Sequence, residues 1–225
     1  MKHGLFKIHI FGNYSLLFFV IILVFIVPLF QTQFHDELFD VFFTLVYITA
    51  TLSVERYRKQ FTATAIVIMA LMWISSPERL PVVNTISNLL GILFFILIVV
   101  SFIITISRSK QVNARVILES INGYLLMGIL FTIIVAVIMT LNPQAFSFPE
   151  GTLNKEQATN FGNYMYYTLV TMSTLGYGDV LPVSPYAKSV ATFISVSGQL
   201  YIAVIIAMLV GKFAGNQTEN NKQLK

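Results

Sequence analysis

Residues 171–179 read TMSTLGYGD, with a single tyrosine between two glycines and two threonines upstream. Glycine lacks a Cβ atom and adopts positive φ angles that other residues avoid. Gly176 and Gly178 therefore allow backbone conformations in this segment that ordinary residues avoid. A Gly-Tyr-Gly triplet alone is weak evidence, because tight turns beside an aromatic residue are common. Its flanking sequence decides what this segment is.

Long apolar stretches surround the segment on both sides. A helix needs about 20 residues to cross a bilayer core about 30 Å thick, and six apolar stretches of roughly that length occur in the sequence. They run from Tyr14 to Phe30, Leu38 to Val54, Phe61 to Ser75, Thr85 to Ile106, Val116 to Leu141 and Ala187 to Lys212. None alternates polar and apolar residues consistently, which argues against membrane-spanning strands. The sequence predicts an all-α membrane protein with six transmembrane helices.

The composition supports a membrane protein and argues against several other classes. Apolar residues make up 56% of the 225 residues and charged residues only 11%, which is typical of a protein in lipid. The basic residues behind the net charge of +4 are scattered between apolar runs, so we expect no nucleic-acid partner. Cysteine is absent, and the three histidines lack metal-site spacing. No paired acids or nucleophile with a base lie inside the spans, so we expect neither an enzyme nor a cofactor.

The basic residues also predict the orientation, because Lys and Arg in short loops tend to stay cytoplasmic. One predicted side keeps only Arg79, Lys155 and Lys188, while the other collects the remaining Lys and Arg residues. We therefore expect a multi-pass protein of the plasma (cell inner) membrane, with both termini cytoplasmic and lipids as partners.

The connection between the fifth and sixth predicted spans is about 45 residues long, more than a turn requires. Its first part contains the helix breakers Asn142-Pro143 and Phe148-Pro149-Glu150-Gly151, whereas Tyr164 to Thr171 reads as a short apolar and aromatic helix. That helix is too short to cross a bilayer. Half-crossing helices are tolerated at membrane depth when protein surrounds them.

In this context, residues 171–179 resemble the selectivity filter of the potassium channel family, whose usual sequence is threonine-valine-glycine-tyrosine-glycine. The resemblance implies a homotetramer in which backbone carbonyls, with the Thr174 hydroxyl at the inner end, replace the water around a permeant K+. The implied ion-binding residues are Thr174, Leu175, Gly176, Tyr177 and Gly178, with K+ held at the first four. Leu175 stands where valine is usual, but the ion would meet its carbonyl, so selectivity is expected to survive.

The resemblance also implies residues that support the filter from behind. The ring of Tyr177 is expected to pack and hydrogen-bond with the pore helix, where Tyr166 and Tyr167 lie at suitable positions. Thr171, at the end of that helix, is a further expected support.

Asp179 resembles the family's aspartate behind the filter, where a carboxylate braces the outer mouth or attracts cations. The alternative is an ordinary solvated turn residue. Some relatives pair this aspartate with a pore-helix glutamate, but Val170 occupies that position here. We therefore expect no carboxylate pair.

Gly198 follows Gly178 by 20 residues, where many relatives carry a glycine hinge in the inner helix. It is a candidate gating hinge. Close helix packing by a small residue is an equally good interpretation.

The first four spans resemble the four-helix unit that senses voltage in many six-helix potassium channels through arginines on the fourth span. Thr85 to Ile106 contains no Lys or Arg, and the nearest bases are Arg108 and Lys110. Moving one charge across the membrane field yields about 2.3 kcal/mol per 100 mV, so we expect weak intrinsic voltage dependence. The short link from Ser107 to Ala114 predicts that each four-helix unit packs on its own subunit's pore.

The expected organisation is a cytoplasmic N-terminus (1–13), a four-helix voltage-sensor-like unit (14–107), a pore domain (108–212) and a disordered cytoplasmic tail (213–225). Such a tail has no room for a regulatory domain, so we expect gating through the membrane domain, lipids or a separate regulatory protein.

The expected function is passive, potassium-selective conduction. The alternatives are a weakly selective cation channel, which usually lacks the filter tyrosine kept here as Tyr177, and a non-conducting structural or sensory subunit. A transporter built from fused channel repeats would need four filter-like loops, and this sequence has one.

Overall fold

The structure is a computed structural model that describes residues 2–30, 35–54, 58–74, 81–109, 112–148 and 161–223. The helices are α1 (Lys2–Ile21), the π turn η1 (Ile22–Ile26), the 3-10 turn η2 (Val27–Leu29), α2 (His35–Ser53), α3 (Arg58–Ile74), α4 (Pro81–Arg108), α5 (Ala114–Leu141), α7 (Phe161–Met172) and α8 (Pro185–Gln223). Two short strands, β1 (Phe146–Ser147) and β2 (Leu181–Pro182), pair antiparallel. The predicted all-helical architecture is confirmed for the described residues, with this one strand pair added.

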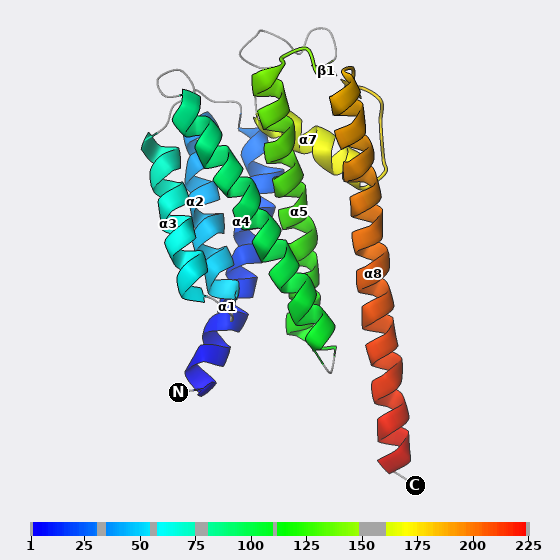
Figure 1. Cartoon of the computed structure of the whole chain (residues 1–225). Helices are drawn as coiled ribbons and strands as arrows, with labels where there is room; N and C mark the ends of the chain where they lie inside the picture. The colour runs from blue at the N-terminus through cyan, green and yellow to red at the C-terminus, as the bar shows by residue number, and fades with distance from the viewer. Residues whose placement is uncertain are drawn as a thin grey trace.

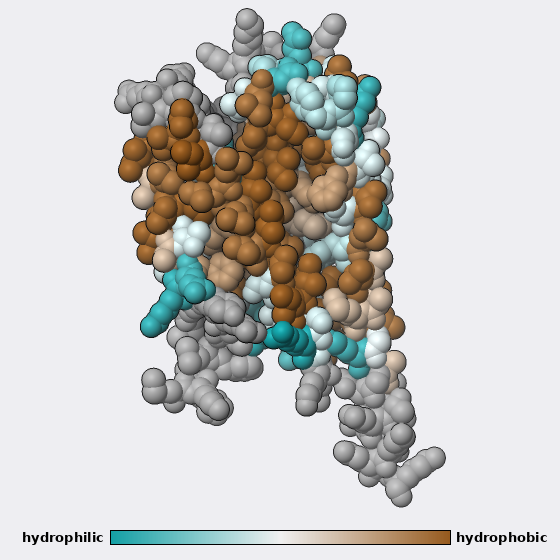
Figure 2. Space-filling view, in the orientation of Figure 1, coloured by the Kyte–Doolittle hydropathy of each residue, from teal (hydrophilic) through white to brown (hydrophobic). Residues whose placement is uncertain are grey.

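Within the described residues, four helical segments are long and apolar enough to cross a membrane, namely Phe11–Leu29, Ile86–Arg108, Ala114–Leu141 and Pro185–Ala214. The second and third predicted spans coincide with α2 and α3, whose apolar parts, Leu38–Ser53 and Lys59–Leu71, are shorter. Hydrophobic side chains cover the middle of the visible face, and hydrophilic side chains lie toward its two ends (Figure 2). The helices therefore have the lengths and surface of a membrane bundle, while the count of six spans stays a prediction.

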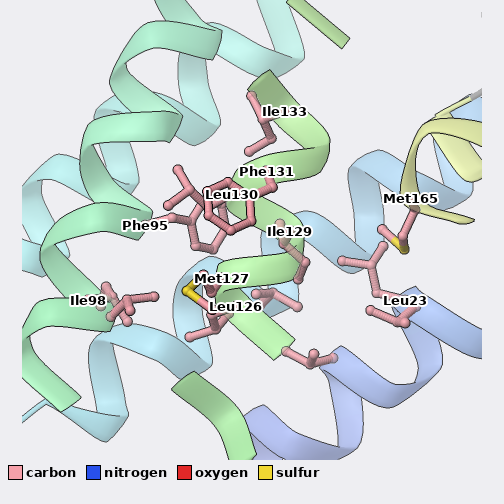
Figure 3. Close-up of a cluster of buried hydrophobic side chains, with 14 of the residues drawn as sticks. Leu23, Phe95, Ile98, Leu126, Met127, Ile129, Leu130, Phe131, Ile133 and Met165 are labelled. Atoms are coloured by element: carbon pink, nitrogen blue, oxygen red, sulfur yellow. The ribbon is translucent and has the colours of Figure 1, made fainter. Parts of the chain in front are cut away.

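The helices form two groups that meet at α5. On one side α1 to α4 stand side by side, and both α1 and α4 pack along α5; on the other side α7 lies between α5 and α8 (Figure 1). Phe95 and Ile98 of α4, Leu23 of η1 and Met165 of α7 gather around α5 in the buried cluster (Figure 3). Because α5 is apolar on nearly every side, it can contact all of these elements at once. It fixes the position of α7, and α7 leads into residues 173–179.

Aromatic side chains fill the core of the four-helix group. The Tyr47 ring lies 4.9 Å from that of Phe94 and 5.2 Å from that of Phe95, measured between ring centroids. Phe61 adds an edge contact to Phe94 at 6.0 Å. Gly91 leaves room for Tyr47, because a Cβ atom there would lie 2.9 Å from the tyrosine hydroxyl. Close-packed rings therefore fill this core, and α4 carries no charged residue before Arg108.

The described residues at both ends of the chain are helical. Helix α1 begins at Lys2 and runs into the first span, so most of the predicted N-terminal segment 1–13 is helical. The prediction of a disordered tail over 213–225 is wrong as far as the structure describes it, because α8 continues to Gln223. Lengthening an existing helix requires no new nucleation, so a polar sequence can extend one that apolar residues have begun.

Candidate functional site

The segment after α7 is held to the end of that helix by backbone hydrogen bonds. The amides of Ser173 and Thr174 donate to the carbonyls of Leu169 and Thr171, at 2.9 and 3.1 Å. The chain then leaves the helix, and the amides of Leu175 and Gly176 both donate to the Val170 carbonyl, at 3.0 and 3.3 Å. The start of the predicted filter is therefore fixed to the last turn of the predicted pore helix, which spans Phe161–Met172 rather than Tyr164 to Thr171.

Positive φ angles occur at alternate residues of this segment. Thr174, Gly176 and Gly178 have φ of 62°, 53° and 78°. A Cβ atom at either glycine would meet nothing within 4 Å, so the backbone angle, not a lack of space, requires glycine there. At Thr174 the same angle is strained, since a branched side chain at positive φ costs about 1–3 kcal/mol. Such strain persists only where function or surrounding structure maintains it.

The segment is exposed on the surface of the single chain. Residues 173–179 are all exposed, and Leu175 and Tyr177 keep 55% and 67% of their surface accessible. The five predicted ion-binding residues thus lie in one continuous exposed segment next to the pore helix. The Leu175 and Tyr177 side chains are therefore not covered by their own chain.

Asp179 has two hydrogen bonds at the end of the segment. The Tyr166 hydroxyl donates to its Oδ2 at 2.6 Å, and the Val180 amide donates to its Oδ1 at 3.0 Å. The tyrosine hydrogen bond is the main cause that lowers the pKa of the Asp179 carboxyl below its ordinary value. Asp179 is thus a braced carboxylate here, and its pore-helix partner is Tyr166, one turn before Val170.

The three tyrosines have different environments. Tyr167 is buried, packs edge-on against Phe146 at 4.9 Å and hydrogen-bonds Thr171. The Tyr166 hydroxyl donates its hydrogen bond to Asp179. The Tyr177 ring is largely exposed within its own chain, so the expected support of that ring by the pore helix stays a prediction.

Gly198 lies where α8 crosses the end of α7. A Cβ atom there would lie only 2.3 Å from the Met172 carbonyl oxygen and 3.1 Å from the carbonyl carbon. Helix α8 runs through this position without a break. The geometry supports close packing as the role of Gly198, and the hinge role stays a prediction.

Comparisons with known proteins identify the part of the chain that contains this segment. The profile described as "Ion channel" matches residues 127–214, which run from α5 through α7 and the exposed segment into α8. The chain carries an ion channel domain. The matched profile describes channels and not enzymes, in line with the expectation from the sequence.

The ion channel domain is distantly homologous to that of voltage-gated potassium channels. The chain is 31% identical over 94 residues to "Potassium voltage-gated channel protein Shal" of Drosophila melanogaster, covering 42% of this chain and 16% of that protein. It is 29% identical over 87 residues to "Potassium voltage-gated channel protein shk-1" of Caenorhabditis elegans, covering 39% of this chain and 16% of that protein. It is 30% identical over 94 residues to "A-type voltage-gated potassium channel KCND3" of Rattus norvegicus, covering 42% of this chain and 14% of that protein. The matches therefore cover less than half of this chain and about a sixth of each relative. No solved structure matches the chain.

Several residues of the ion channel domain were not identified from the sequence. The Val170 carbonyl is a backbone group, so residue types give no signal for it. The strand pair β1–β2 fixes the segment after the filter to the end of α5, with the Ala145 carbonyl accepting from the Val183 amide at 2.8 Å. Strands of two residues are too short to produce an alternating pattern. Neither the Val170 carbonyl nor this strand pair could therefore be predicted from the residue types.

Proposed function

We propose that the chain is one subunit of a potassium-selective channel, in which four copies of residues 174–178 surround a common axis and pass K+ down its gradient. The observation that carries the proposal is the alternation of positive φ at Thr174, Gly176 and Gly178 in an exposed segment held by the pore helix. Alternating backbone angles of this kind can turn successive carbonyls toward one side. Oxygens arranged in that way can replace the hydration shell of a permeant cation.

The proposed tetramer explains why much of the surface of α8 is exposed in the single chain. Only 22% of the spanning window of α8 is buried inside the chain, against 61% for α5. The exposed side chains of α8 include Phe193, Val196, Leu200, Val204 and Val210. Neighbouring subunits would cover part of this face, and the remainder would line the ion path.

Six spans with both termini cytoplasmic fit the lengths of α2 and α3. With 19 and 17 residues, these helices are about 28 and 26 Å long, close to the thickness of a bilayer core. They lie alongside α1 and α4 in the bundle (Figure 1). The distribution of basic residues among the loops supports a cytoplasmic position for both ends of the chain, in a cell inner membrane.

The decisive experiment is a flux assay with purified protein in liposomes. We expect K+ and Rb+ to pass, Na+ and Li+ to be excluded, and Ba2+ to block. Comparable Na+ and K+ fluxes would indicate a weakly selective cation channel, and no flux above empty liposomes would indicate a non-conducting subunit.

A pair of glycine variants tests whether the filter segment carries the flux. Gly176→Ala forces alanine into a positive φ of 53° and should abolish K+ flux. Gly211→Ala is the matched control, because its Cβ would also meet open space and alanine favours a helix. Equal fluxes from the two variants would contradict the assignment of the filter.

A further inference from the structure

The C-terminal part of α8 is attached to the end of α4 by one lysine. The Lys212 ammonium donates hydrogen bonds to the carbonyls of Ile106 and Ser107, the second at 3.0 Å. Both carbonyls belong to the last turn of α4, where intrahelical donors run out and the helix dipole favours a cation. Lysine is a recognised partner for such helix ends, so the contact joins complementary groups on two different helices.

A second attachment lies three turns earlier on the same face of α8. The Tyr201 hydroxyl donates to the Ser120 carbonyl of α5 at 2.9 Å, and Tyr201 is only 8% exposed. Gly123 provides the necessary space, since a Cβ atom there would lie 2.2 Å from the Tyr201 hydroxyl. Lys212 follows Tyr201 by 11 residues, about three helical turns, which places both side chains in one row along α8. Ile205, between them, is also buried.

The row faces away from the proposed ion path. The exposed side chains Leu200, Val204 and Phe213 lie off the buried row, on surface that this chain does not cover. In the proposed tetramer α8 lies next to the axis, and α4 and α5 lie outside it. A bond from α8 to α4 therefore holds the end of α8 outward, away from the axis.

We infer that Lys212 anchors the end of the pore-lining helix on the C-terminus of α4 and thereby favours an open inner entrance. The inference rests on the proposed channel function and adds a positioning residue for its gate. It gives α4 a direct connection to the pore that requires no row of charged residues on α4. A displacement of α4 would be transmitted to α8 by this bond as well as by the link to α5.

Crosslinking tests the anchor independently of conduction. The chain contains no cysteine, so Ser107→Cys/Lys212→Cys introduces the only two thiols in each subunit. A short bifunctional thiol reagent should join them within one subunit, which proteolysis between α4 and α8 followed by a denaturing gel detects. In the control pair, Ser107→Cys/Phe213→Cys, the second thiol is on the neighbouring residue, which is 60% exposed. Equal yields from both pairs, or products formed only between subunits, would overturn the anchor.

Single-channel recording in planar bilayers tests the role in gating. Lys212→Met should lower the open probability about fivefold, with conductance and K+/Na+ permeability unchanged. Lys212→Arg, which keeps the positive charge, should have an open probability close to that of the wild type. Lys188→Met, which removes an exposed charge at the other end of α8, should behave like the wild type. An unchanged or higher open probability in Lys212→Met would overturn the inference, whereas a wild-type protein that does not conduct would refute the proposed function and leave the crosslinking result valid.

Discussion

The two halves of the molecule are completed in different ways. Helices α1 to α4 close an aromatic core around Tyr47, Phe94 and Phe95 within one chain. Helix α8 is less covered by its own chain, with 22% of its spanning window buried against 39% for Ile86–Arg108, and residues 173–179 expose strained backbone. The first half is a finished bundle, whereas the second has the features of one part of a larger assembly. The difference indicates that α1 to α4 contribute mainly to stability, whereas α8 and residues 173–179 contribute an interface and the proposed ion path.

Outside the filter itself, the largest effect is expected at the contact between α7 and α8. Gly198→Ala places a methyl group 2.3 Å from the Met172 carbonyl oxygen, and Met172 immediately precedes the filter segment. Because that obstacle is backbone, the end of α7 has to move. We expect K+ flux into liposomes to fall more than about tenfold and thermal stability to decrease. Gly211→Ala is again the control, and wild-type flux from Gly198→Ala would show that α7 and α8 do not need this close approach.

A core substitution in the four-helix group should affect stability but not selectivity. Phe94 is fully buried and contacts Tyr47, Phe61 and Phe95. Phe94→Ala should cost about 3 kcal/mol in unfolding free energy, measured by denaturant titration in detergent. Leu93→Ala, at a position that is 51% exposed, should cost far less.

The ion selectivity of the Phe94→Ala channels that still fold is the second measurement. Their K+/Na+ permeability ratio should equal that of the wild type, because the substituted ring lies in the four-helix core and not in the ion channel domain that contains the filter. A changed ratio would show that the filter depends on the four-helix core and would break the comparison between the two halves.

The outer mouth should respond to external acid through Asp179. Its pKa is lowered by the Tyr166 hydrogen bond, so that bond contributes at pH values above the ordinary pKa of aspartate and is lost as pH falls through the lowered value. Tyr166→Phe removes the hydroxyl, so the Asp179 pKa should rise. The external pH that halves the K+ current should therefore move to a higher value. Tyr164→Phe, which alters another tyrosine of α7, should leave that pH unchanged, and an equal shift in both variants would exclude Asp179 as the titrating group.

The sequence predicted the parts of the pore that depend on residue type. Gly176 and Gly178 were identified because only glycine adopts their backbone angles without cost. The same angle at Thr174 was not predictable, since threonine normally avoids it and accepts it only where neighbouring structure imposes it. The ordered tail of α8 was missed because helix continuation depends on the preceding helix more than on local polarity.

Contacts between distant residues were also beyond sequence reasoning. The bond from Tyr201 to Ser120 and the bonds from Lys212 to the end of α4 join side chains to backbone carbonyls. Every residue has such a carbonyl, so residue types do not mark the acceptor. Only the packing of α4, α5 and α8 brings these groups together.

The smallest expected effect is that of membrane voltage. Helix α4 carries no charge before Arg108, at its last turn, so little charge can cross the field when α4 moves. One full charge would change the open probability about fiftyfold over 100 mV, from about 2.3 kcal/mol per charge. We expect a change in open probability far below this in voltage-clamped bilayers. Lys212→Met should lower the open probability at every voltage without altering the slope of its dependence on voltage. A slope as steep as that of an arginine-rich sensor would mean that charge moves elsewhere in the chain, and the four-helix group would then be more than a support for the pore.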